Sequence, residues 1–382
     1  MTTWYCPLPF KHAFIDTGGI SPCCATTSSF NINTTIQDWG SHPKLIEFQQ
    51  QFLNGESPAA CIECKRQEKI QNKSLRLDAL RDYNDEIFTN TQLEFIHYSQ
   101  SNICNFKCRS CNPRYSHGIA NEFKNNPILL KLPGGTKKEQ LVSVSTANQE
   151  WIIDNITAIR RIMITGGEPT VMPEIRKLFE YLKNNPQPQL QIMITTNGSW
   201  TDNFWYEVIQ SCPNLHITIS IDGVGSTAEL VRHGTVWPQV EYNLKWLAKN
   251  SYSLDINTVI SRLNILHLYP ILKLCCEARD SSTCATGGKN GDLGLRHQFS
   301  ICNYPLYMTI TNFPDAIKTD ILAHLTHCLE LDLDEEQRML VNGLIATVTD
   351  STHNEKLWNE TEQYQFEFDR IRNEDHTQLY LT

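Results

Sequence analysis

The sequence has no apolar run that approaches the roughly 18 residues of a transmembrane helix. Its first stretch, MTTWYCPLPFKHAF, lacks the positively charged region followed by an apolar segment that marks a signal peptide. It also lacks a block of Lys and Arg, and 33 basic residues against 42 acidic ones give a formal net charge of −9. These absences predict a cytoplasmic protein without a membrane span, and they argue against nucleic acid or an anionic membrane surface as its main partner.

Internal repeats and low-complexity tracts are absent as well. The length of 382 residues allows one large domain or two to three smaller ones. A composition that is 40% hydrophobic and 20% charged is that of an ordinary globular protein with a sizeable core. The 14 cysteines are not expected to form disulfides in a reducing compartment, so metal ligands and buried thiols are the better expectations.

From about residue 92 the pattern alternates between strands and helices. Apolar, β-branched and aromatic runs predict strands at 93–99, 160–165, 190–196, 215–221 and 254–261. The spacing of Ile175, Leu178, Phe179 and Leu182 predicts a helix with one face in the core. Segments of helical length follow at 201–211, 236–249 and 265–278. Apolar strands that alternate with helices predict a parallel sheet covered by helices.

The remaining segments do not follow this alternation. Residues 1–90 are rich in cysteine and turns and only weakly periodic. Residues 128–146 resemble an exposed insertion, and residues 279–298 form a Gly/Ser-rich loop of a length usually tied to function or disorder. The stretches FSIC and LYMTIT after it are candidates for a last strand, and residues 314–373 are expected to be mainly helical.

Three cysteines stand within eight positions in the segment SNICNFKCRSC, where Cys104, Cys108 and Cys111 form a C-x3-C-x2-C motif. A structural zinc site needs four closed ligands, and the nearest further candidates, His97 and His117, complete no standard finger spacing. Three free thiols in one polar loop would gain nothing by packing. An iron–sulfur cluster with three protein thiolates leaves one iron open, as a catalytic cluster requires, so the spacing favours this interpretation.

The motif and its position after the first strand of the parallel unit resemble those of radical SAM enzymes. The GGEP turn, made of Gly166, Gly167, Glu168 and Pro169, follows the second strand and resembles the methionine-binding turn of that family. In the family, the glycines let the backbone approach the cofactor and the acid meets the ammonium group of S-adenosylmethionine. A Gly-Gly turn alone would be a weak signal, but here it falls where the family predicts it.

Two further turns agree with this resemblance in order and position. TTNG, with Asn197, ends the third strand, and SIDG, with Ser220 and Asp222, ends the fourth; Arg232 follows. The resemblance implies that these residues belong to the cofactor site and that Ser220 and Arg232 approach the ribose and carboxylate of S-adenosylmethionine. All the motifs lie at C-terminal strand ends, where parallel α/β barrels gather their chemistry.

The sequence departs from the family at one position. The family often has an aromatic or large apolar residue before the third cysteine, beside the adenine, whereas this chain has Ser110. Phe106 is a nearby aromatic residue, and we include it among the expected cofactor-binding residues. The resemblance covers about residues 92–270 and implies an α/β fold, a partial (β/α)6 TIM-like barrel of radical SAM type.

The N-terminal region has its own cysteine pattern. Cys6, Gly18 and Cys23 give C-x11-G-x4-C, and Cys61 and Cys64 add C-x2-C. Four thiolates suit a fully protein-ligated cluster or a structural zinc. The pattern resembles the twitch/SPASM auxiliary-cluster domain of radical SAM enzymes, placed here before the barrel, and the tail RIRNED…LY also resembles that group. Cys24 is the alternative to Cys23 as a ligand.

The other cysteines are expected to be buried thiols: Cys212, Cys275, Cys276, Cys284, Cys302 and Cys328. Cys284 and Cys302 flank the Gly-rich loop near the expected barrel mouth, and both are weak candidates for a hydrogen-atom donor; the catalytic residues are otherwise unknown. We expect a twitch-like domain at 1–90, the radical SAM partial barrel at 91–278, and a loop, last strand and C-terminal helical extension at 279–382.

The resemblance implies two 4Fe–4S clusters and S-adenosylmethionine as cofactors, with flavodoxin or ferredoxin as an electron donor. Cleavage of S-adenosylmethionine would give a 5′-deoxyadenosyl radical that abstracts a substrate hydrogen. Relatives with auxiliary domains often modify peptides by crosslinking, thioether formation or epimerisation, so a peptide or protein is the first substrate class by analogy. The alternatives are oxidation or rearrangement of a small metabolite, and a non-enzymatic iron–sulfur or zinc regulatory module.

Overall fold

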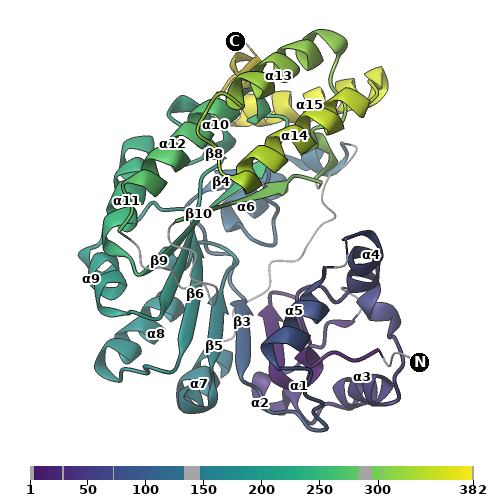
Figure 1. The fold of residues 1–382 in the computed structure, drawn as a ribbon, viewed down its shortest axis with the longest axis vertical. Coiled ribbons are helices and arrows are strands. Elements are labelled where there is room, and N and C mark those ends of the chain that lie inside the picture. Colours follow the sequence, from purple (N-terminus) through teal and green to yellow (C-terminus); the bar gives the residue numbers. More distant parts are fainter. Residues whose placement is uncertain are drawn as a thin grey trace. The chain divides into compact units, whose positions relative to one another are not determined.

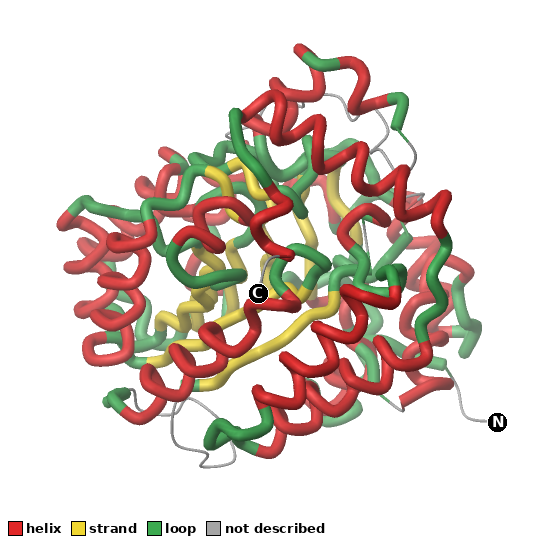
Figure 2. The backbone as a smooth tube through the Cα atoms, turned by 90° about the horizontal axis from the view of Figure 1, so that it is seen from above, coloured by secondary structure: helices red, strands yellow, loops and turns green. Residues whose placement is uncertain are grey.

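The structure is a computed structural model, and it describes residues 4–27, 30–71, 73–132, 147–283, 295–303 and 305–380. Strands and helices alternate along most of this chain, as Figure 1 and Figure 2 show. The alternation places a turn or loop after each core strand, and the motifs identified in the sequence fall in these connections.

Eight strands are hydrogen-bonded in the order β10-β9-β7-β6-β5-β3-β1-β2, and β4 and β8 form a separate two-stranded ladder. The pairs β1–β3, β3–β5, β7–β9 and β9–β10 are parallel, and β1–β2 is antiparallel. The strands are β1 (His12–Asp16), β2 (Gly19–Ser21), β3 (Phe95–Ser99), β4 (Lys107–Cys108), β5 (Arg161–Ile164), β6 (Gln191–Thr196), β7 (Leu215–Ser220), β8 (Arg232–His233), β9 (Ser253–Ile260) and β10 (Arg296–Ile301).

The helices lie mainly between the strands and at the C-terminal end of the sequence. Their bounds are α1 (Leu8–Lys11), α2 (Ile36–Trp39), α3 (Pro43–Leu53), α4 (Ile62–Gln71), α5 (Leu75–Asp82), α6 (His117–Asn125), α7 (Ala147–Asp154), α8 (Pro173–Asn184), α9 (Asn203–Ser211), α10 (Ser226–Val231), α11 (Trp237–Asn250), α12 (Leu268–Asp280), α13 (Asp315–Cys328), α14 (Glu335–Asp350) and α15 (Glu355–Arg372). None of the described helices is long and apolar enough to cross a membrane.

Local side-chain caps explain where helices begin. The Ser116 hydroxyl accepts a hydrogen bond from the backbone N of Ile119 and so fixes the start of α6, directly after the loop with the three cysteines. Asp334 and Gln337 form a reciprocal capping box at the start of α14. These caps satisfy backbone N–H groups that have no partner within the helix.

The contacts divide the chain into two compact units. The first contains the described residues of 1–101, 142–167 and 172–193, and the second those of 102–141, 168–171 and 194–382. The first unit holds β1, β2, β3 and β5, and the second holds β7, β9 and β10. The division falls within β6, between residues 193 and 194.

The core of the second unit includes a cluster formed by α12 and the C-terminal helices. Leu272 of α12, Leu325 of α13 and Leu344 of α14 are among its fully buried members. Figure 1 shows α13 and α14 beside each other in this region. Because burial of one large aliphatic side chain stabilises a fold by about 1.5–3 kcal/mol, this cluster contributes substantially to the stability of the C-terminal part.

The structure confirms the predicted strands and helices of the central region and the helical character of residues 314–373. One expectation is wrong: LYMTIT contains the 3₁₀ helix Leu306–Met308, whereas FSI of FSIC ends β10. The Tyr307 and Met308 side chains of that turn are buried, so apolarity alone did not distinguish the two states. The predicted insertion is described only to residue 132, and residues 284–294 of the predicted loop also lie outside the described residues.

The sequence did not indicate that the N-terminal region contributes to the main sheet. β1 pairs in parallel with β3, with Phe14 opposite His97. All five residues of β1 are buried, so the strand has no alternation of apolar and polar residues to reveal it. The domain boundaries at residues 90 and 278 and the partial-barrel geometry stay predictions.

Candidate metal and cofactor site

The three cysteines of the C-x3-C-x2-C motif lie in a loop of the second unit that is held by its own hydrogen bonds. The Cys111 backbone N donates to the Cys108 carbonyl oxygen at 3.0 Å, and the Phe106 backbone N donates to the Cys104 Sγ at 3.4 Å. The Ser116 hydroxyl, which caps α6, donates to the Phe106 carbonyl oxygen at 2.9 Å. We call residues 104–111 the cysteine loop.

The three thiols are near enough to interact electrostatically. Burial, with a contribution from Cys108, raises the pKa of Cys104 to about 12. Burial and both other thiols raise the pKa of Cys111 as well. Burial also raises the pKa of Cys108, although the Arg232 guanidinium acts in the opposite direction. Because a thiolate binds metal, this set fits a cationic metal group that stabilises the deprotonated form.

Arg232 lies beside this group of thiols. Cys108 and Arg232 are register partners in the antiparallel pair β4–β8. The Arg232 Nη1 donates to the Asp222 Oδ2 at 2.6 Å, and its guanidinium carbon is 5.9 Å from the centre of the Phe106 ring. Burial acts to lower the pKa of Arg232, but Cys108 and Asp222 outweigh burial and raise it.

One polar atom of Arg232 makes no hydrogen bond to the described residues. Its side chain is only 13% exposed, and its Nε has no hydrogen-bond partner within the part of the chain that the structure describes. A buried donor of this kind is costly unless a ligand satisfies it. This donor fits a ligand carboxylate, which is the group that the resemblance places here.

Asp222 and Phe106 support Arg232 from within the protein. The Asp222 Oδ1 accepts from the Val259 backbone N at 2.8 Å, so the carboxylate joins the end of β7 to β9 and also holds Arg232. The Phe106 ring is 1% exposed. Phe106 is therefore packed inside this part of the second unit, and its place beside an adenine stays a prediction.

Glu168 is 1% exposed and fixes two turns. Its Oε1 accepts from the Thr170 and Thr196 hydroxyls, each at 2.7 Å, and from the Thr170 backbone N at 3.1 Å. Its Oε2 accepts from the Asn197 backbone N at 2.6 Å. Burial raises the pKa of Glu168 despite these hydrogen bonds, which act to lower it. The acid thus joins the GGEP turn to the TTNG turn.

The first part of the GGEP turn belongs to the first unit and approaches the chain after β3. Gly166 has a φ of +104°, and a Cβ there would lie 2.9 Å from the Ser101 carbonyl oxygen. The Gly167 backbone N donates to the same oxygen at 3.0 Å. Only glycine fits both the backbone conformation and this close approach. Pro169 begins the 3₁₀ helix Pro169–Val171 and is buried.

Asn197 connects the TTNG turn with the cysteine loop. Its Nδ2 donates to the Asn105 Oδ1 at 2.9 Å, and the Asn105 Nδ2 donates to the Ser199 hydroxyl at 2.8 Å. The sequence analysis did not identify Asn105, although its position between Cys104 and Cys108 places it in the same loop as the expected metal ligands. Ser220 is the last residue of β7, opposite Asn257 of β9, and its role toward a cofactor stays a prediction.

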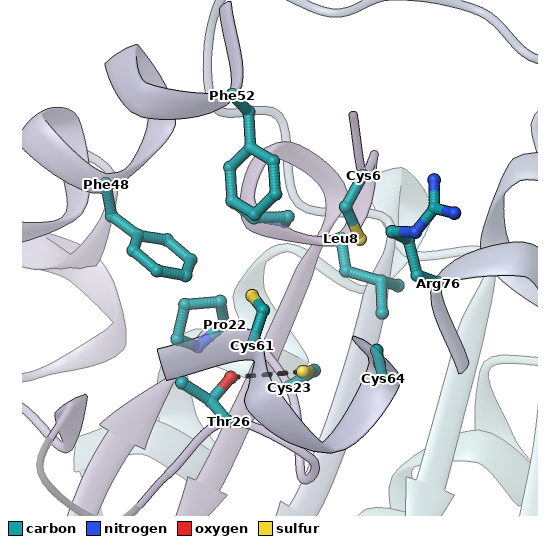
Figure 3. A pocket seen from close by; sticks show the side chains of 11 residues that line it. Cys6, Leu8, Pro22, Cys23, Thr26, Phe48, Phe52, Cys61, Cys64 and Arg76 are labelled. Atoms are coloured by element: carbon teal, nitrogen blue, oxygen red, sulfur yellow. Dashed lines mark hydrogen bonds between the residues drawn. The ribbon is translucent and has the colours of Figure 1, made fainter. Parts of the chain in front are cut away.

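The four N-terminal cysteines that the sequence grouped together line one pocket of the first unit. Cys6, Cys23, Cys61 and Cys64 are among its lining residues, and Figure 3 shows them with Thr26 and Arg76 around the pocket. Cys24 is exposed and does not line it.

The thiols of this pocket also interact with one another. Burial and the Cys23, Cys61 and Cys64 thiols raise the pKa of Cys6. Burial and the neighbouring Cys23 and Cys64 raise the pKa of Cys61 to about 12. Four convergent thiols are the donor set that a metal group with full protein ligation requires.

Neither cysteine group has the arrangement of a site for a single ion. Among the described residues, no group of three or more His, Cys, Asp or Glu side chains is placed to hold one metal ion. The thiolates of an iron–sulfur cluster bind different irons, so they stand further apart than the ligands of one ion.

Of the two candidates for a hydrogen-atom donor, Cys302 belongs to the described residues. Cys302 is 5% exposed and lies in an apolar cluster with Tyr307 and Tyr364, against which Cys111 also packs. Cys284 lies outside the described residues. Both assignments stay predictions.

Comparison with known proteins identifies the central part of the chain. Residues 98–275 match the radical SAM superfamily. These residues form a radical SAM domain. The domain contains the cysteine loop, the GGEP, TTNG and SIDG turns and Arg232, whereas the N-terminal pocket and the C-terminal helices lie outside it.

Curated relatives of the radical SAM domain are enzymes. One is the S-adenosylmethionine-dependent nucleotide dehydratase of Flammeovirga pacifica, 30% identical over 168 residues that cover 42% of this chain and 52% of the relative. Another is the GTP 3′,8-cyclase of Clostridium perfringens (strain 13 / Type A), 25% identical over 189 residues that cover 49% of this chain and 53% of the relative. The chain spans about half the length of the curated relatives it matches.

The chain also has a distant likeness among solved structures. A structure of the tagged protein anSMEcpe with bound AdoMet aligns with a TM-score of 0.42 at 18% identity, over 62% of this chain and 59% of that one. A likeness at this level assigns no function.

Proposed function

We propose that the protein is a radical SAM enzyme in which Cys104, Cys108 and Cys111 hold a 4Fe–4S cluster. When bound, the cluster would supply one electron to S-adenosylmethionine, which would split into methionine and a 5′-deoxyadenosyl radical that takes a hydrogen atom from the substrate and becomes 5′-deoxyadenosine. The single observation that carries the proposal is the juxtaposition of three interacting thiols with Arg232 inside the matched domain. The Nε of Arg232, which has no hydrogen-bond partner among the described residues, adds a buried donor next to the thiols.

The residues of the chain bind and orient S-adenosylmethionine in this proposal. Arg232 meets the carboxylate of the cofactor, and Asp222 holds the guanidinium in place. Glu168 presents a buried negative charge to the ammonium group while it keeps the GGEP and TTNG turns together. Asn197 fixes the TTNG turn against Asn105, and Ser220 approaches the ribose.

We also propose that Cys6, Cys23, Cys61 and Cys64 hold a second cluster, as in a twitch/SPASM-like domain. Their convergence on one pocket supports a common metal group, and the absence of Cys24 from that pocket favours Cys23 as the ligand. Four thiolates leave no open iron, so this cluster would relay electrons or support the fold. Structural zinc is the alternative for the same four thiols, and it would require them to draw closer together, because no group of the described side chains is placed to hold one ion.

The substrate we propose first is a peptide or protein, which the enzyme would crosslink, join by a thioether or epimerise. The resemblance of the N-terminal cysteines to the auxiliary domain supports this class by analogy. A second candidate is a small metabolite, and the relatives named as a nucleotide dehydratase and a GTP cyclase favour a nucleotide. A reduced flavodoxin or ferredoxin in the cytoplasm would donate the electron.

The test of this function is the formation of 5′-deoxyadenosine by reduced protein prepared without oxygen. Replacing Cys104, Cys108 and Cys111 together by Ala should abolish the product, because no thiolate remains to hold the cluster. The matched control is Cys212→Ala, which removes a thiol at the end of α9 and should leave the product unchanged. Product formation by the triple variant would refute the assignment.

A further inference from the structure

A fully buried arginine lies inside the cysteine loop. Arg109 directly follows Cys108, and its side chain is 0% exposed. Its Nη2 donates to the Glu374 Oε2 at 2.7 Å and forms an ion pair with Asp369. A buried guanidinium is strongly destabilising without such partners. The cysteine loop is therefore held by carboxylates that lie 260 and 265 positions further along the chain.

Glu374 contacts a second loop as well. Its Oε1 is in hydrogen-bond contact with the Nδ1 of His233, the residue after Arg232. The Arg109 backbone N also donates to the Val231 carbonyl oxygen at 2.9 Å. One carboxylate thus bridges the cysteine loop and the segment 231–234, which carries the arginine we assign to the carboxylate of S-adenosylmethionine.

The residue before Cys108 is tied to the same C-terminal segment. The Lys107 Nζ is 2.6 Å from the Glu122 Oε1, and the Arg372 Nη2 is 2.7 Å from the Glu122 Oε2. The Arg372 side chain is 0% exposed. Both neighbours of Cys108 in the sequence are therefore connected through charges to the end of α15.

The backbone after α15 is shaped for these contacts. Asn373 has a φ of +54°, and its backbone N donates to the Asp369 carbonyl oxygen, so the helix ends in a left-handed turn. The turn lets Glu374 approach Arg109 although Asp369, one helical turn earlier, contacts the same guanidinium. Asparagine tolerates this conformation better than most residues with a side chain.

We propose that Glu374 is a positioning residue of the cofactor site, which sets the cysteine loop and the Arg232 segment relative to each other. This inference deepens the proposed function and rests on it for the identity of the ligand. Glu374 touches neither a thiol nor Arg232 itself, and it acts through Arg109 and His233. A role limited to anchoring the C-terminal helix would not require one carboxylate to contact both loops.

The test is the Glu374→Gln variant of the full chain, isolated with its iron. Amide hydrogen exchange in the absence of S-adenosylmethionine should accelerate at residues 104–111 and at 231–234, by about tenfold if one charge-assisted hydrogen bond is lost. The Kd of S-adenosylmethionine should rise by a similar factor, while the iron content stays unchanged. Unchanged exchange at both segments would overturn the proposal.

The matched control is Glu367→Gln on α15, the helix that precedes Glu374. Glu367 pairs with Arg370, whose side chain is 60% exposed, and neither contacts the two loops in the described structure. This control should leave exchange at both segments and the Kd unchanged. Equal acceleration in both variants, or acceleration confined to α15, would show an anchoring role only and would overturn the proposal.

Two further results keep the inference separate from the proposed function. If Glu374→Gln does not fold, His233→Asn replaces it and removes the contact between Glu374 and His233. This variant should accelerate exchange at 231–234 but not at 104–111. Acceleration at neither segment would overturn the inference. If wild-type protein makes no 5′-deoxyadenosine while exchange responds as expected, the function fails and the positioning role stands. If the product forms and exchange does not respond, the proposed function stands and the positioning role fails.

Discussion

At the scale of single residues, the buried carboxylate of Glu168 accepts four hydrogen bonds within the proposed cofactor site. The resemblance to radical SAM enzymes implies that it meets an ammonium group, and the structure adds four protein donors to its two oxygens. A carboxylate with this many donors is stabilising for the turns in the absence of any ligand. The structural role and the proposed binding role therefore need a substitution that separates them.

Glu168→Gln is that substitution, because it removes the charge and keeps one acceptor oxygen. We expect S-adenosylmethionine affinity to fall at least about tenfold, the loss of a charge-assisted bond of about 1.5–3 kcal/mol. Thr170→Val is the control, since it removes one hydrogen bond to Glu168 and no charge. Isothermal calorimetry gives the affinities and urea unfolding the stabilities. Equal affinity in Glu168→Gln and wild type would remove the ammonium role.

The site residues that the sequence revealed share one property: they stand in short motifs whose chemistry is local. Cys104, Cys108 and Cys111 were identifiable from spacing alone. Arg109 stands within the same motif and was missed, because its partners Asp369 and Glu374 are 260 and 265 positions away. An exposed arginine and a buried one look the same in a sequence until the fold brings carboxylates to one of them.

At the scale of elements, a buried histidine of β10 adds side-chain hydrogen bonds to the parallel ladder between β10 and β9. The His297 Nε2 is 2.8 Å from the Thr258 hydroxyl of β9, and the Gln337 Nε2 of α14 is 3.4 Å from its Nδ1. Thr258 in turn donates to the Ile221 carbonyl oxygen of the SIDG turn at 2.7 Å. Since Gln337 donates to Nδ1, the proton of the neutral ring lies on Nε2. The network joins the C-terminal helices to a turn of the proposed site.

This network should make stability depend on pH. Burial lowers the pKa of His297 to about 3, from an ordinary value of 6.5. Between these values the unfolded chain binds a proton that the folded chain does not, so stability is present above about pH 6.5 and falls as the pH falls, by about 2 kcal/mol at pH 5. Urea unfolding of His297→Gln should show a pH dependence that is smaller by this amount.

Ser300→Ala on the same strand provides the control, since it removes an exposed residue without a titratable group and should leave the pH dependence of unfolding as it is in the wild type. An identical pH dependence in His297→Gln and wild type would contradict the assignment of the buried neutral ring.

Elements were predictable where local pattern and tertiary environment agree. The central strands are apolar runs that end in turn motifs, and α8 shows a clear helical period, so both were found. The strand β1 was missed because it is buried on both faces and only five residues long. LYMTIT was a candidate for the last strand beside FSIC, because buried 3₁₀ turns and buried strands are equally apolar.

At the scale of the whole molecule, two sets of thiols in two units predict two metal groups. Complete reconstitution should give about eight irons per chain if both are 4Fe–4S clusters. The Cys104/Cys108/Cys111 triple alanine variant should keep about four of them, and these should not respond to S-adenosylmethionine, since four thiolates leave no open iron. Replacing Cys61 and Cys64 should remove the other four.

Metal analysis also decides between the two interpretations of the N-terminal pocket. Stoichiometric zinc with about four irons in the wild type would make that pocket structural. An unchanged iron count after loss of Cys6 and Cys23 would show that the ligands were wrongly chosen, with Cys24 the first alternative. The sequence predicted the four cysteines as a group because their spacing repeats a known pattern, but spacing could not show that Cys23 rather than Cys24 lines the pocket.

The most direct test of the central claim is the amount of 5′-deoxyadenosine formed from S-adenosylmethionine by the reduced protein. We predict product from the wild type, from Cys212→Ala and from the variant without Cys61 and Cys64, and none from the variant without Cys104, Cys108 and Cys111. Product from that last variant, or no product from reconstituted wild type with a full complement of iron, would contradict the account.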